Sequence, residues 1–293
     1  VRWVISFRPP WAASRVLNGE GLLAETRFEF GANWIDFVGK ALNDRRVASA
    51  VADTRRLLRC DTLQGRSFLD VGCGSGLFSL AAHALGAERV VSFDFDPRSV
   101  SASEILRSRF QIPADRWAIH CGSVLDEAFL DSLDPADVVY SWGVLHHTGD
   151  MWKGIANAAR MVRPGGHLAI SIYNRVTRFP DRSTMWWEIK RFYVRAPGAV
   201  RSAVELGYVL NHMATRLISL RNPLRPLLER SGEGRRGMDF WHDARDWLGG
   251  FPYEFATAGE VFEFVHGRLG MELIYLNTVE GNACNEFLFR HAR

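Results

Sequence analysis

The sequence predicts an α/β protein with a doubly wound, mostly parallel sheet, and three observations support this prediction. Apolar segments of strand length alternate with helical patterns between residues 67 and 173, as in parallel sheets whose strands are joined by helices. The strand cores at residues 138–140 and 168–170 are apolar throughout, as expected for strands buried on both faces. A glycine-rich turn at residues 72–76 joins the first predicted strand to a helix.

The composition indicates a globular protein with no marked preference for charged partners. The chain has 293 residues, of which 47% are hydrophobic, and its formal net charge is +3. This length suits one α/β core with an insertion or a cap. So small a positive balance does not indicate nucleic acid or a membrane surface as a partner. No apolar run approaches the roughly 20 residues that a transmembrane helix needs.

The four cysteines, at positions 60, 73, 121 and 284, are widely separated in the sequence. They form no C-x-x-C pair, so neither a zinc site nor a disulfide framework is expected. Unpaired cysteines are typical of the reducing cytoplasm, where we expect this protein. The apolar stretch near the start is broken by arginine and proline at residues 8–10, which is not typical of a signal peptide.

The chain divides into four predicted parts. Residues 1–60 hold an N-terminal segment and one helix, predicted over residues 35–58, and could form a lid. Residues 61–182 form the core that contains the glycine turn. The alternation of strands and helices stops at residues 183–258, which we interpret as a helical cap insertion. Residues 259–293 supply the last strands of the sheet, and we expect the final one to be antiparallel.

The turn after the first predicted strand follows Asp70 and carries three alternating glycines, Gly72, Gly74 and Gly76. Glycine is needed where the backbone takes a positive φ or a ligand approaches it closely, so such a turn forms a floor for a nucleotide-like ligand. The spacing differs from the G-x-G-x-x-G of dinucleotide-binding proteins, because Leu77 stands where the third glycine is required. The pattern D-x-G-x-G-x-G resembles the first motif of class I S-adenosylmethionine (SAM)-dependent methyltransferases.

Three further segments match that family in the expected order. Asp94 ends a second predicted strand about 20 residues after the turn, where a ribose-binding carboxylate belongs. Residues 137–141 form a later strand that leads into residues 142–147, and a proline-glycine-glycine turn at residues 164–166 precedes another strand. The four matches span residues 68–173 and imply a Rossmann-like fold, with SAM as the cofactor and S-adenosylhomocysteine as its product.

The resemblance also implies a role for each residue of the cofactor site. The glycine turn would pass beneath the methionine part of SAM, with Asp70 orienting that region. Asp94 would accept hydrogen bonds from two ribose hydroxyls, because a carboxylate offers paired acceptors. Ser123 would border the adenine, where many relatives carry an acid, and Phe95 could flank the adenine or simply lie in the core. The predicted cofactor-binding residues are Asp70, Gly72, Gly74, Gly76, Asp94, Phe95, Ser123, Val124 and Trp142.

The segment after the fourth predicted strand carries two candidate catalytic histidines, His146 and His147. Ligands of open α/β sheets bind at the carboxyl ends of strands, so this segment should face the methyl group of SAM. A hydroxyl acceptor needs a base to take its proton, and histidine titrates in the suitable range. His147 is the better candidate because relatives often carry histidine at the matching position. Alternatively, either histidine only caps or packs against the next helix.

One departure from the family concerns metals. The sequence is somewhat similar to the ubiquinone-pathway O-methyltransferases, which carry carboxylates in this segment to hold a metal. Gly143 and His146 stand at those positions here. We therefore expect no metal and no metal-assisted mechanism.

The predicted insertion carries a second group of polar and aromatic residues. His242 and Asp246 share one face if their segment is helical, and a carboxylate that fixes a histidine tautomer commonly supports a base. His242 is therefore a third candidate catalytic residue, and two potential ligands alone are weak evidence for a metal. The alternative is a salt-bridged surface helix with two core tryptophans. The candidate acceptor-binding residues are Trp34, Trp241, Asp246 and Tyr253.

These features together predict an enzyme that transfers the methyl group of SAM to a small molecule, with oxygen as the first choice of acceptor atom and in-line displacement as the mechanism. N- or C-methylation stays open, and a carboxylate acceptor would need no base. A methyltransferase of RNA or protein is a second hypothesis, which predicts a continuous basic face. A non-catalytic SAM-binding module is the third. We expect neither nucleic acid nor a membrane as a partner, and a monomer or a homodimer.

Overall fold

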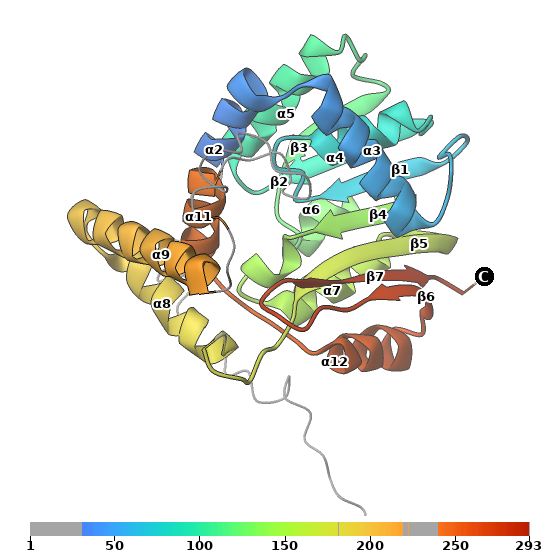
Figure 1. Cartoon of the computed structure of the whole chain (residues 1–293). Helices are drawn as coiled ribbons and strands as arrows, with labels where there is room; N and C mark the ends of the chain where they lie inside the picture. The colour runs from blue at the N-terminus through green and yellow to red at the C-terminus, as the bar shows by residue number, and fades with distance from the viewer. Residues whose placement is uncertain (1–30, 181, 219–221, 223–239, 293) are drawn as a thin grey trace, which may run out of the picture.

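The structure, a computed structural model, describes residues 31–180, 182–218, 222 and 240–292. One sheet forms its centre, with helices on both faces (Figure 1). Most of the predicted N-terminal segment lies outside the described residues.

The seven strands of the sheet lie in the order β3-β2-β1-β4-β5-β7-β6. Strands β1 to β5 are mutually parallel, whereas β7 runs antiparallel to both β5 and β6. The predicted fold class is therefore confirmed. The chain winds one way from β1 and the other way from β4, and ligands of open sheets bind at such a switch point. The strands are β1 (Ser67–Val71), β2 (Arg89–Asp94), β3 (Trp117–Cys121), β4 (Ala136–Trp142), β5 (Val162–Tyr173), β6 (Glu272–Asn277) and β7 (Cys284–Arg290).

The helices cover the two faces of the sheet in two groups and form two hydrophobic cores. Phe68 and Leu69 of β1 are adjacent in sequence, both are 1% exposed, and they belong to opposite cores. Side chains alternate between the faces of a strand, so a strand covered on both faces is apolar throughout. One core contains residues of α3 (Asp44–Leu58), α4 (Leu77–Ala84) and α5 (Pro97–Arg109); the other contains residues of α6 (Glu127–Asp131), α7 (Met151–Arg160) and α12 (Ala258–Phe262).

Residues 35–58 do not form the single helix that their periodicity predicts. Helix α2 (Gly31–Asp36) passes into a π-helical turn, η2 (Phe37–Ala41), and α3 begins after a break. Asn43 caps α3, because its side chain accepts a hydrogen bond of 3.0 Å from the N–H of Arg46. The apolar spacing continues across the break because both segments contribute residues to the same core.

Between β5 and α12, the residues that the structure describes form three helices, which Figure 1 shows grouped beside the sheet. These insertion helices are α8 (Ser183–Arg195), α9 (Gly198–Ile218) and α11 (Phe240–Gly249). Glu205 of α9 is buried and accepts hydrogen bonds from Tyr193 of α8 at 2.7 Å and from Arg245 of α11 at 3.1 Å. One carboxylate thus links all three insertion helices.

A buried carboxylate on β7 ties the last strands to the N-terminal helix α3. Glu286 accepts two hydrogen bonds from the guanidinium of Arg56, at 2.7 and 2.9 Å. It also accepts one from the indole of Trp142 at 3.0 Å and one from Asn277 at 3.0 Å. Burial alone would raise the pKa of Glu286, but these hydrogen bonds lower it below its usual value. Trp142, at the end of β4, is therefore held by a charged network.

We expect Arg56→Met to destabilise the fold by about 2–3 kcal/mol, because it leaves the buried charge of Glu286 undercompensated. The expected loss is at the low end for buried ion pairs because the Arg56 side chain is 42% exposed and water can replace part of it. Urea unfolding at pH 7 measures the loss. Arg89→Met removes an exposed ion pair with Asp134 and should change stability by about 0.5 kcal/mol or less. Equal losses in the two variants would contradict this account.

Candidate functional site

The glycine turn leaves β1 in a conformation that requires glycine. Gly72 and Gly74 have φ values of 76° and 54°. A Cβ atom on Gly72 would lie 2.3 Å from the side chain of Val144, so no larger residue fits there. The N–H groups of Gly72 and Cys73 both donate to the carbonyl of Phe93 on β2, at 2.9 and 3.0 Å. The turn is thus held against the end of β2.

Asp94, the last residue of β2, is oriented by two backbone N–H groups. One carboxylate oxygen accepts from Gly74 at 3.0 Å, and the other accepts from Asp96 at 2.9 Å. Each carboxylate oxygen has two lone pairs, which is the acceptor chemistry that the hydroxyls of a ribose require. The next residue, Phe95, is 57% exposed although it is a large apolar side chain. The carboxylate of Asp94 and the exposed ring of Phe95 therefore follow each other at the end of β2, next to the glycine turn.

Asp70 is buried within the protein, where it joins β1 to α4. Its carboxylate accepts a hydrogen bond of 2.6 Å from the hydroxyl of Ser79. Burial, and to a lesser extent the nearby charge of Asp94, raises the pKa of Asp70 to about 7. Its role in orienting a ligand remains a prediction.

Trp34 lies against the same turn, on helix α2. A Cβ atom on Gly74 would lie 3.1 Å from the indole ring of Trp34. The N–H of Gly31 donates to the carboxylate of Asp96 at 2.9 Å and so ties α2 to the start of α5. Trp34 is thus placed at the glycine turn, and its predicted contact with the acceptor stays a prediction.

The predicted adenine-binding residues follow β3. The N–H of Gly122 donates to the carbonyl of Asp94 at 3.0 Å, so this segment lies beside the end of β2. The hydroxyl of Ser123 accepts a hydrogen bond from the N–H of Leu125 at 3.1 Å. Val124 is only 5% exposed and packs in the core. Their contacts with adenine therefore remain predictions.

The two histidines after β4 have opposite hydrogen-bonding roles at Nδ1. His146 is fully buried, and its Nδ1 accepts a hydrogen bond of 3.3 Å from the N–H of Tyr173. The Nδ1 atom of His147 lies 2.6 Å from the carbonyl oxygen of Pro252. Because a carbonyl only accepts, Nδ1 of His147 must carry the proton and donate. In the neutral ring, Nε2 of His147 is then the acceptor, which is the form that a base requires.

Aromatic side chains surround this histidine pair. The ring of Tyr173, at the end of β5, lies 5.5 Å from that of His147, 5.7 Å from Trp247 and 5.1 Å from Tyr253. Lys190 of α8 is buried and donates to the carbonyl of Trp247. Its ammonium also lies 4.8 Å from the ring of Tyr253. The insertion helices therefore contact the end of β4 and β5 through an aromatic cluster.

Tyr253, predicted to bind the acceptor, belongs to this cluster, and so do residues that sequence reasoning missed. Tyr253 is 1% exposed, and burial raises the pKa of its phenol well above the usual value. Tyr173 and Lys190 were not predicted as site residues. Tyr173 could have been found from its place at the carboxyl end of a strand, whereas no local pattern marks Lys190.

The remaining predicted residues lie on α11. His242, Trp241 and Asp246 fall within this helix, but their side chains lie outside the described part of the structure. Their catalytic and acceptor-binding roles stay predictions. Within the described residues, no group of three or more His, Cys, Asp or Glu side chains is placed to hold a metal ion.

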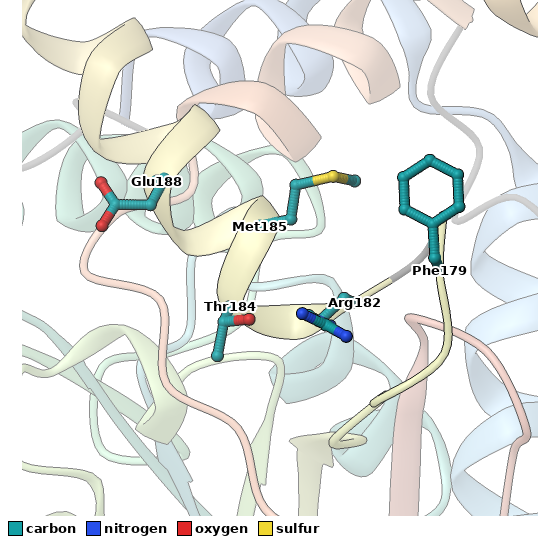
Figure 2. Close-up of a pocket in the computed structure, with 5 residues that line it drawn as sticks. All are labelled: Phe179, Arg182, Thr184, Met185 and Glu188. Carbon is teal, nitrogen blue, oxygen red and sulfur yellow. The ribbon is translucent and has the colours of Figure 1, made fainter.

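The surface of the insertion carries a pocket of about 430 Å³ at the start of α8. Figure 2 shows Thr184, Met185 and Glu188 projecting from this helix, with Phe179 and Arg182 on the chain that precedes it. This mixed lining has no residue in common with the predicted site. Among the described helices, none is long and apolar enough to cross a membrane.

The fold and the glycine turn define the class I SAM-dependent methyltransferases. A family model described as a methyltransferase domain, Methyltransf_23, matches residues 42–207, which is more than half of the chain. The chain belongs to this family. This family match does not single out the ubiquinone-pathway O-methyltransferases among its members.

Individual relatives match a shorter segment. The ribosomal protein L11 methyltransferase of Azotobacter vinelandii is 41% identical over 109 residues, which are 37% of this chain and 34% of the relative. That of Pseudomonas aeruginosa is 37% identical over 109 residues, with the same shares of each chain. The chain thus spans about a third of the length of these curated relatives. A chain from the solved complex of the Haloferax volcanii Trm112 methyltransferase activator superposes with a TM-score of 0.51 and 14% identity, over 91% of this chain and 99% of that one; this likeness shows the fold.

The residues at the turn suit SAM, the cofactor of this family. Asp94 supplies carboxylate oxygens, which are acceptors for hydroxyl groups, and Phe95 exposes a ring that can cover an aromatic base. The glycines bring no side chains of their own to this edge of the sheet, where Val144 and Trp34 pack against Gly72 and Gly74. The donor and acceptor chemistry at this edge therefore fits an adenosyl group.

Proposed function

We propose that this chain transfers the methyl group of SAM to a hydroxyl oxygen of a small molecule, with His147 as the general base. The observation that carries this proposal is the 2.6 Å hydrogen bond from His147 Nδ1 to the carbonyl of Pro252. It leaves Nε2 as the basic nitrogen, at the end of β4 and beside an aromatic cluster. The predicted roles of Asp94 and Phe95 in holding the cofactor belong to the same proposal.

Bound SAM supplies an activated methyl group on a sulfonium. The remaining work of the protein is to align the acceptor, exclude water and take a proton. Tyr173 and Trp247, which are only partly buried, offer an aromatic surface near His147, which suits a flat organic acceptor. His147 would receive the hydroxyl proton at Nε2 as the oxygen attacks the methyl carbon.

The acidity of the hydroxyl limits which acceptors a histidine can serve. A phenol has a pKa of about 10 and histidine one of about 6.5, so moving the proton costs about 5 kcal/mol. An aliphatic hydroxyl, with a pKa near that of water at about 15.7, costs about 12 kcal/mol by the same conversion. We therefore propose a phenolic or enolic hydroxyl as the acceptor.

His147→Ala should lower methyl transfer to a phenolic acceptor about 100-fold or more, the usual size of a general-base contribution. Its affinity for SAM should change little, because His147 is not among the predicted cofactor-binding residues. The measurement is release of S-adenosylhomocysteine across a panel of phenols, with SAM affinity from calorimetry. His266→Ala is the matched control, because His266 Nδ1 also lies 2.8 Å from a backbone carbonyl, that of Met271. A similar small loss in both variants would refute the base role.

A protein acceptor is the second candidate, because curated relatives that match over 109 residues are ribosomal protein L11 methyltransferases. The matched segment is 37% of this chain, so most of the chain lies outside it. Incubation with tritiated SAM and ribosomal proteins tests this alternative. Label in protein, with none in any phenol of the panel, would favour it. SAM binding without label in either would favour the non-catalytic module.

A further inference from the structure

The loop after β4 is fastened to a distant segment, residues 252–254, by hydrogen bonds at three places. The carbonyl of His146 accepts from the N–H of Glu254 at 2.9 Å. The Nδ1 of His147 donates to the carbonyl of Pro252 at 2.6 Å. The carboxylate of Glu254 accepts from the N–H groups of Gly149 and Met151, both at 3.0 Å. Glu254 thus binds His146, at one end of the loop, through its backbone N–H. It binds Gly149 and Met151, at the other end, through its side chain.

The carboxylate is well suited to this contact. Met151 is the first residue of α7, and the first N–H groups of a helix have no partner within it. An anion there also interacts favourably with the helix dipole. Asp150 caps the same helix from within, by accepting from the N–H of Lys153 at 3.2 Å. Glu254 is therefore a second cap, supplied from 103 residues further along the chain.

We infer that Glu254 is a positioning residue that holds the Pro252 carbonyl against His147 and so fixes the proton on Nδ1. Pro252 is two residues from Glu254, so movement of the Glu254 backbone moves this carbonyl. Without the carboxylate contact the segment keeps its backbone bond to His146, its bond to the His147 ring and the packing of Tyr253 against Tyr173, but loses its link to the start of α7. The functional meaning of this inference rests on the proposed base role of His147, but the tautomer itself is measured without any acceptor.

The test is nitrogen NMR of the full chain labelled at histidine, saturated with S-adenosylhomocysteine at pH 8. The His147 signals are assigned by comparison with His147→Gln. In the wild type we expect one neutral tautomer with the proton on Nδ1. In Glu254→Gln the ratio of the Nδ1–H to the Nε2–H form should fall about tenfold, the effect of weakening one hydrogen bond.

Glu260→Gln is the matched control. Glu260 also caps a helix, by accepting from Thr257 at 2.8 Å, and it should leave the His147 tautomer as in the wild type. An unchanged ratio in Glu254→Gln, or an equal change in both variants, overturns the inference. Should Glu254→Gln not fold, Glu254→Asp keeps the charge on a shorter side chain and should shift the ratio in the same direction; a wild-type ratio there also overturns it. If the kinetics of His147→Ala refute the base role of His147, the result of the tautomer measurement is unaffected.

Discussion

Asp94→Ala is expected to weaken SAM binding at least 100-fold. A hydrogen bond to a charged group contributes about 1.5–3 kcal/mol, and Asp94 is proposed to accept from two ribose hydroxyls. The variant also loses the bonds that orient the turn through the N–H groups of Gly74 and Asp96. Asp94→Asn keeps one carbonyl oxygen and should give an intermediate loss. Titration calorimetry with SAM measures both variants.

The control for this prediction is Asp126→Ala. Asp126 also accepts a backbone hydrogen bond, from Phe129 at 3.1 Å, as the cap of α6. Removing it should lower stability slightly and leave SAM affinity within about twofold of the wild type, because losing a cap typically costs about 1 kcal/mol of stability. Unchanged affinity in Asp94→Ala would contradict the ribose assignment.

Asp70 should make the fold less stable as the pH rises from about 4 to 7. Burial raises its pKa to about 7 from a usual value of 3.8. Over this window the native state keeps a proton that the unfolded state has released, so stability falls with rising pH. From pH 5 to pH 7, a span of two units, the free energy of unfolding should fall by about 2.7 kcal/mol. Buried Glu254, whose pKa is raised by burial to about 7, acts in the same direction, whereas Glu286 and Asp137, with lowered pKa values, act in the opposite one.

The variant Asp70→Asn isolates the contribution of this carboxylate. It keeps an acceptor for Ser79 and carries no charge at any pH. Relative to the wild type, it should gain about 2–3 kcal/mol of stability between pH 5 and pH 8, measured by guanidinium unfolding at each pH. Asp134→Asn, at a side chain that is 80% exposed, should show no such difference. A gain equal to that of the control would mean that Asp70 is ionised in the native state well below pH 7.

The sheet could be predicted because its signals are local. Each parallel strand is a short apolar run, and the turn at residues 72–76 marks the first of them. Periodicity does not reveal the break before α3, because the apolar spacing carries on through Leu42, which lies within the break, and Val47, which follows it. The capping preference of Asn43 was the signal that could have placed it.

The candidate site could be predicted only in part, for a physical reason. The glycines form a short motif and Asp94 ends the next strand, 20 residues after Gly74, and the structure brings them to one edge of the sheet. The partner of His147 is a backbone carbonyl 105 residues away, and a backbone group leaves no trace in residue type. The place of Trp34 also depends on how a separate helix docks, which spacing alone does not determine.

The insertion helices lie between β5 and β6, in the stretch of chain that separates β5 from its antiparallel neighbour β7, and these two strands pair from Tyr173 with Cys284 to His167 with Arg290. Closing such a long connection is an entropic penalty that grows only with the logarithm of its length, by about 0.6 kcal/mol for each doubling. That segment can therefore be exchanged or lengthened at little entropic cost while the paired strands stay in register. The turn at residues 72–76 has no such latitude, because a Cβ on Gly72 would meet Val144 and one on Gly74 would meet Trp34.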